Sequence, residues 1–78
     1  MICLVQLDQP NRKGVADFGD RVYEFEFHAY SYGALHPSNF TVHNMTRDGK
    51  RAQNPERGAV IQKAIARAWV REPLPDPR

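Results

Sequence analysis

Cysteine is almost absent from this chain of 78 residues, which contains only Cys3. A single cysteine excludes an internal disulfide and is typical of proteins in a reducing compartment. No apolar run approaches the roughly 20 residues that span a bilayer. The start of the chain lacks the basic segment of a signal peptide, and its apolar stretch is too short for one. We therefore expect a cytoplasmic protein without a membrane partner.

Short motifs of established chemistry are also missing. The chain has no phosphate-binding glycine-rich loop, no nucleophile-elbow serine and no zinc-protease histidine pair. His28, His36 and His43 lack the close pairing of zinc ligands, so we interpret them as ordinary side chains. Cys3 lies in an apolar run, which favours a buried structural thiol over a nucleophile. The sequence therefore predicts no catalytic residue, no metal, no cofactor and no enzyme activity.

The length of the chain limits the size of its core. Seventy-eight residues suffice for one small domain. We expect this domain over residues 1–72, followed by an extended proline-rich tail over residues 73–78. A core of this size leaves only a few kcal/mol of net stability. Because a homodimer would bury more surface, self-association is predicted.

Three segments alternate between two kinds of side chain, as β-strands do: residues 2–8, 21–32 and 40–47. We expect Met45 to share a face with Thr41 and His43. The opposite face of the strands is apolar and is predicted to form the core, with Cys3, Val5, Leu7, Tyr23, Phe25, Phe27, Ala29, Phe40 and Val42.

Two connections are predicted as loops. Residues 9–20 make a connection about twice the usual length, from which Val15 and Phe18 are expected to reach the edge of the core. Asp48-Gly49 is a strong turn signal, and the polar run that follows to Asn54 is expected to continue the loop.

A helix follows the second loop. Asn54 is a preferred N-cap residue, Pro55 suits the first helical position, and Glu56 suits the first turn. Pro73 ends the helix. Its apolar stripe recurs at spacings of three and four and consists of Val60, Ile61, Ala64, Ile65, Ala68 and Trp69. The predicted fold is α+β: a three-stranded antiparallel β-meander with one C-terminal amphipathic helix packed on one face.

One helix covers only one face of a three-stranded sheet, which leaves acidic and aromatic side chains without a cover. Tyrosine and tryptophan are enriched at protein interfaces. An alternative is that the tyrosines fold over the turn at residues 33–37. Ala59, Ala66 and Val70 make the outer side of the helix poor in charge, which also suggests contact with a partner. The predicted protein-binding residues are Glu24, Glu26, His28, Tyr30, Tyr32 and Trp69.

Basic residues suggest a second kind of surface. Residues 1–46 carry three basic and five acidic side chains, whereas residues 47–78 carry eight basic and four acidic ones. Such residues could contact phosphates, or they could form an ordinary solvated helix face. The candidate nucleic-acid-binding residues form a helix ridge and the loop before it: Arg47, Lys50, Arg51, Lys63, Arg67 and Arg71.

The absence of motifs and the sheet face together favour a binding function. We predict a small non-enzymatic module that modulates or inhibits a larger partner protein by surface occlusion. In size and lack of catalytic motifs, the chain resembles the small accessory proteins of phages and other mobile elements. The alternative is a small nucleic-acid-binding protein that uses the basic helix ridge and loop. The small net charge of +2 favours the first hypothesis.

Overall fold

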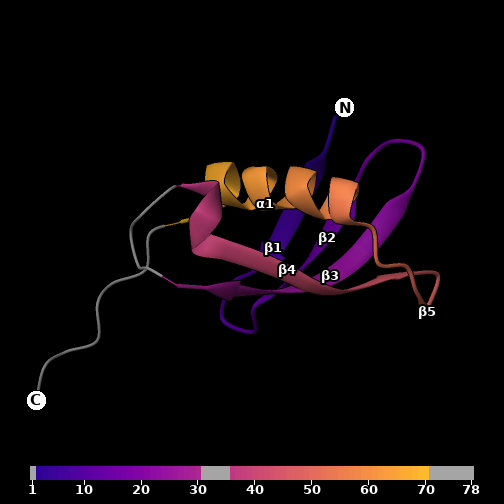
Figure 1. The fold of residues 1–78 in the computed structure, drawn as a ribbon, viewed down its shortest axis with the longest axis horizontal. Helices are drawn as coiled ribbons and strands as arrows, with labels where there is room; N and C mark the ends of the chain where they lie inside the picture. Colours follow the sequence, from indigo (N-terminus) through magenta and orange to yellow (C-terminus); the bar gives the residue numbers. More distant parts are fainter. Residues whose placement is uncertain (1, 31–35, 71–78) are drawn as a thin grey trace, which may run out of the picture.

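The computed structural model describes residues 2–30 and 36–70. It contains an antiparallel sheet of five strands, whose order follows the sequence from β1 to β5. Helix α1 lies across one face of this sheet (Figure 1). The elements are β1 (Leu4–Asp8), β2 (Lys13–Asp17), β3 (Val22–Ala29), a 3₁₀ turn η1 (Pro37–Asn39), β4 (Phe40–Arg47), β5 (Lys50–Arg51) and α1 (Pro55–Ala68).

The α+β class, the antiparallel sheet and the C-terminal helix are confirmed, but the prediction of three strands is wrong. The predicted loop at residues 9–20 contains β2, which pairs with β1 on one side and β3 on the other. Glycine, alanine, aspartate and lysine are all poor strand formers, so tertiary pairing rather than local propensity produces this strand. Phe18 is buried as predicted, whereas Val15 is 38 % exposed and points away from the helix.

Gly14 allows the central aromatic residues to pack against β2. It pairs with Leu7 in β1 and with Phe25 in β3. A Cβ atom at position 14 would lie 2.5 Å from Cζ of Phe25 and 2.9 Å from the carbonyl oxygen of Gln6. The Phe25 ring therefore occupies the space that a side chain at position 14 would need.

The second missed strand, β5, follows a tight hairpin. Asp48 and Gly49 have φ angles of 54° and 77°. Positive φ at both central residues defines the type I′ turn, which joins twisted antiparallel strands. Arg47 therefore pairs with Lys50, and Thr46 pairs with Arg51. The predicted loop after the Asp-Gly turn is wrong for these two residues.

A β-bulge in β4 changes the face on which Met45 lies. Glu26 pairs with His43 and Glu24 with Thr46, so β4 contains one more residue than β3 over this stretch. Asn44 takes up the extra residue with a φ of 50°. Met45 is consequently buried in the core, and its predicted position beside Thr41 and His43 is wrong.

Helix α1 begins as predicted and ends earlier. The Asn54 side chain accepts a hydrogen bond from the backbone N–H of Arg57 at 3.1 Å. The helix stops at Ala68 because the side-chain amide of Gln9 forms hydrogen bonds with both the backbone N–H and the backbone carbonyl of Val70. Its nitrogen donates to the Val70 carbonyl at 2.9 Å, and its oxygen accepts from the Val70 N–H at 2.8 Å.

The core lies between α1 and the sheet. Phe25 and Phe27 are buried in one cluster with Ile61 and Ile65, as predicted. Two alanine predictions are wrong because the helix also packs against η1 and ends early: Ala66 is buried, whereas Ala68 is exposed.

Trp69 belongs to the same core, with 5 % of its surface exposed. Its ring lies 5.1 Å from the ring of Phe40 and 6.0 Å from that of Phe27. Trp69 is thus buried in the core, whereas the sequence places it among the protein-binding residues. Tyr32, Arg71 and the predicted tail at residues 73–78 lie outside the described residues.

Candidate functional site

The sheet has one face against α1 and one face that no element of the described residues covers (Figure 1). We call the second face the open face. Strand registers assign its side chains, because directly paired residues lie on the same side of a sheet. They are Leu4, Gln6, Asp8, Lys13, Val15, Asp17, Val22, Glu24, Glu26, His28, Thr41, His43, Thr46 and Arg51.

A row of charged and polar residues crosses four strands on the open face. Asp8 pairs with Lys13, Lys13 with Glu26, and Glu26 with His43. The Asn44 amide nitrogen donates to Oε1 of Glu26 at 3.3 Å, and Oε2 of Glu26 lies 3.9 Å from Nε2 of His43. The bulge that buries Met45 thus also places Asn44 where it can hold Glu26.

Next to this row lies a cluster of aromatic and imidazole rings. The rings of His28 and His43 stack with a centroid distance of 4.5 Å and an interplanar angle of 20°. Tyr30 lies 6.2 Å from His28, and its hydroxyl accepts a hydrogen bond from Oγ1 of Thr41 at 3.2 Å. Tyr30 nevertheless remains 66 % exposed. The cluster therefore presents a tyrosine that its neighbours orient but do not cover.

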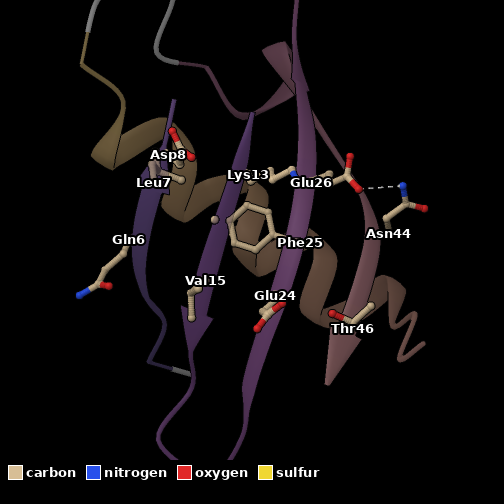
Figure 2. A pocket seen from close by; sticks show the side chains of 11 residues that line it. Gln6, Leu7, Asp8, Lys13, Val15, Glu24, Phe25, Glu26, Asn44 and Thr46 are labelled. Carbon is tan, nitrogen blue, oxygen red and sulfur yellow. Dashed lines mark hydrogen bonds between the residues drawn. The ribbon is translucent and has the colours of Figure 1, made fainter. Parts of the chain in front are cut away.

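The open face is hollowed above β2 and β3. The hollow has a volume of about 540 Å³. Figure 2 shows the Phe25 ring between the two strands, with the Val15 and Glu24 side chains next to it. Within the described part of the chain, no hydrogen bond or ion pair engages the Glu24 carboxylate. The lining residues are Gln6, Leu7, Asp8, Lys13, Gly14, Val15, Glu24, Phe25, Glu26, Asn44 and Thr46.

The fold brings together four of the six predicted protein-binding residues. Glu24, Glu26, His28 and Tyr30 all lie on the open face. Sequence reasoning missed the part of this face that β2 and the bulge contribute, above all Lys13, Val15 and Asn44. The one signal for β2 was the unusual length of the connection at residues 9–20.

The candidate nucleic-acid-binding residues are divided between two faces. Arg51 lies on the open face, whereas Arg47 and Lys50 point to the other side of the hairpin. Lys63 and Arg67 are exposed on α1. Arg67 is in the last turn of a helix about 21 Å long whose first turn follows that hairpin. The fold therefore does not gather those of these basic residues that the structure describes into one compact cluster.

Two electrostatic perturbations occur on the helix side, away from the open face. Arg57 donates hydrogen bonds of 3.1 and 3.2 Å to the two carboxylate oxygens of Asp20, and this contact lowers the pKa of Asp20. The Arg57 guanidinium also lies 4.7 Å from the centre of the Phe18 ring. Burial raises the pKa of Cys3 and so favours its protonated thiol. The ion pair joins α1 to the segment before β3, and neither perturbation builds a reactive group.

The described residues contain no cluster of three or more histidine, cysteine or carboxylate side chains that could hold a metal ion. No described helix is long and apolar enough to cross a membrane. The open face is thus a surface of ordinary polar, acidic and aromatic side chains. No family model, curated protein or solved structure matches this chain.

Proposed function

We propose that this protein is a non-enzymatic binding module that docks on a larger protein through its open face. When docked, it covers part of the partner's surface and thereby modulates or inhibits the partner. The observation that carries the proposal is the exposed Tyr30, held by Thr41 and His28 on a sheet face that the described residues leave uncovered. Oriented aromatic side chains of this kind supply much of the energy of protein interfaces.

The dimensions of the open face indicate a modest interface. Five strands spaced by about 4.8 Å span about 19 Å, and the eight residues of β3 extend over about 26 Å. The projected area is then at most roughly 500 Å², because β1, β2 and β5 are shorter than β3, and this places the contact toward the small end of specific protein interfaces. A contact of this size suits a regulatory interaction that can be reversed.

The rigidity of the sheet favours binding. The backbone of β3 is paired on both sides, and behind it lie the buried rings of Phe25 and Phe27. A partner therefore meets a preformed surface and need not order a flexible segment.

Nucleic-acid binding is the second candidate. Lys63 and Arg67 are exposed one turn apart on α1 and could each contact a phosphate. An aromatic ring that could stack on a base would have to lie beside them. Tyr30 is on the opposite side of the molecule, and this separation supports ranking the nucleic-acid hypothesis second.

Photo-crosslinking in the native host tests the proposal. Benzoylphenylalanine is placed either at Val15, on the open face, or at Ala59, which is exposed on α1. We expect a discrete protein adduct from position 15 and none from position 59. An adduct that forms only from position 59, or one that nuclease treatment removes, would contradict docking through the open face.

A further inference from the structure

The two exposed sides of the protein carry charge of opposite sign. The open face has four acids, Asp8, Asp17, Glu24 and Glu26, and two bases, Lys13 and Arg51, which gives a balance of two negative charges. On α1 the exposed charged side chains are Glu56, Lys63 and Arg67, with a balance of one positive charge. A partner of the open face is therefore attracted if it is basic.

The hollow concentrates this negative charge. Three of the four acids line it, namely Asp8, Glu24 and Glu26, and Lys13 is the one basic residue in its lining. Hydrogen bonds from Asn11 and Asn44 already engage Asp8 and Glu26. The Glu24 carboxylate has no such contact within the described residues, so both of its oxygens are available to a donor.

Apolar atoms lie next to the free carboxylate. Val15, which pairs directly with Glu24, is 38 % exposed and supplies this apolar surface, whereas the Phe25 ring lies between β2 and β3 and is only 2 % exposed (Figure 2). Arginine matches this arrangement, because its guanidinium forms two parallel hydrogen bonds with a carboxylate and its stem packs on apolar surface. A volume of about 540 Å³ also leaves room for the residues on either side of such an arginine.

We infer that the open face receives a basic segment of the partner protein, and that an arginine of this segment binds Glu24 in the hollow. The inference rests on the proposed docking function and adds the chemistry of the partner. Neither a nucleic-acid backbone nor an acidic peptide fits, since each would bring negative charge to a surface that already carries an excess of it.

Titration of the full chain with a short peptide, followed by backbone amide NMR, tests the inference. The probe is a capped hexapeptide of alternating arginine and valine, and the matched probe has glutamate in place of each arginine. We expect the arginine peptide at millimolar concentration to shift amides of β2, β3 and the bulge around Asn44, and the glutamate peptide to leave them unchanged. Shifts of equal size with both peptides, or none with the arginine peptide, would overturn the inference.

A pair of variants distinguishes a specific contact from general attraction. Glu24→Gln keeps the shape of the side chain and removes its charge, and we expect it to weaken binding of the arginine peptide at least about threefold. Glu56→Gln removes the same charge from α1 and should leave the affinity unchanged. Equal weakening by both variants would exclude Glu24 as the binding residue. Crosslinking from position 15 is scored separately, so a failed peptide titration beside a protein adduct refutes the basic partner and leaves the docking function standing.

Discussion

The two faces of the sheet are built from the same strands, but the side chains of one face are buried against α1 and those of the other are largely exposed. Toward α1, β3 places Tyr23, Phe25 and Phe27, each at most 2 % exposed. On the open face the intervening positions hold Glu24 and His28, which are exposed, and Glu26, which is half-buried. The first face supplies the free energy of folding, since each large apolar side chain buried there contributes about 1.5–3 kcal/mol. The second contributes little to stability and is therefore free to serve binding.

The largest effect is expected from the helix-covered face. Phe27→Ala removes a ring that packs against Phe40 and Trp69, and we expect it to lower the free energy of unfolding by about 3–5 kcal/mol. Val22→Ala, in the same strand on the open face, serves as the control and should change it by less than about 0.5 kcal/mol. Urea denaturation measures both. Similar losses of unfolding free energy for the two variants would contradict the view that only the face toward α1 stabilises the fold.

A smaller loss of stability is expected where the Phe25 ring packs against the backbone of Gly14. Gly14→Ala brings a Cβ atom against the Phe25 ring and the Gln6 carbonyl. We expect this overpacking to cost about 1–3 kcal/mol of unfolding free energy. Val15→Ala is the control on the neighbouring residue, which points to the open face. A Gly14→Ala protein as stable as the wild type would show that the close approach of Phe25 is not required.

The contact between Asp20 and Arg57 predicts a dependence of stability on pH. The folded pKa of Asp20 lies below its unfolded value, so its stabilising effect is full above about pH 4 and is lost as the pH falls through the folded pKa. Asp20→Asn removes that titration. Thermal unfolding from pH 6 down to pH 2 should therefore show the melting temperatures of the wild type and the variant converging at low pH. Curves separated by a constant amount would contradict this assignment.

Self-association stays a prediction, and the edge of the sheet offers a place for it. Within the described residues no further strand pairs with β1 on its outer side. Ile2, just before this strand, and Leu4, its first residue, are 76 % and 69 % exposed. Sedimentation at micromolar concentration should detect a dimer, and Leu4→Lys should dissociate it, because a lysine on an edge strand opposes pairing. A 9.0 kDa monomer for the wild type would refute the prediction.

Sequence patterns predicted those parts of the fold that have strong local signals. The alternation in β3 and the cap at Asn54 gave the central strand, its two faces and the start of α1. The end of α1 at Ala68 could not be predicted, because it depends on Gln9, which is 61 positions from Val70 along the chain. The strand β2 also could not be predicted, because its residues have little strand propensity and it forms only by pairing with β1 and β3.

The candidate site could be predicted only along β3. Glu24, Glu26, His28 and Tyr30 follow from strict alternation within one segment. The rest of the open face depends on the register between strands and on the bulge at Asn44, which no single segment encodes. Trp69 lies at the flank of the apolar stripe, and only the packing of the helix end decided that it is buried.

The central claim is that Tyr30 serves binding and not folding. The direct measurement is the yield of the crosslinked protein adduct from position 15 with and without Tyr30→Ala, together with the melting temperature of each protein. We predict that Tyr30→Ala lowers the yield about tenfold, as loss of an interface anchor does, and leaves the melting temperature within about 2 °C of the parent. An unchanged adduct yield, or a loss of yield that follows unfolding, would contradict the account.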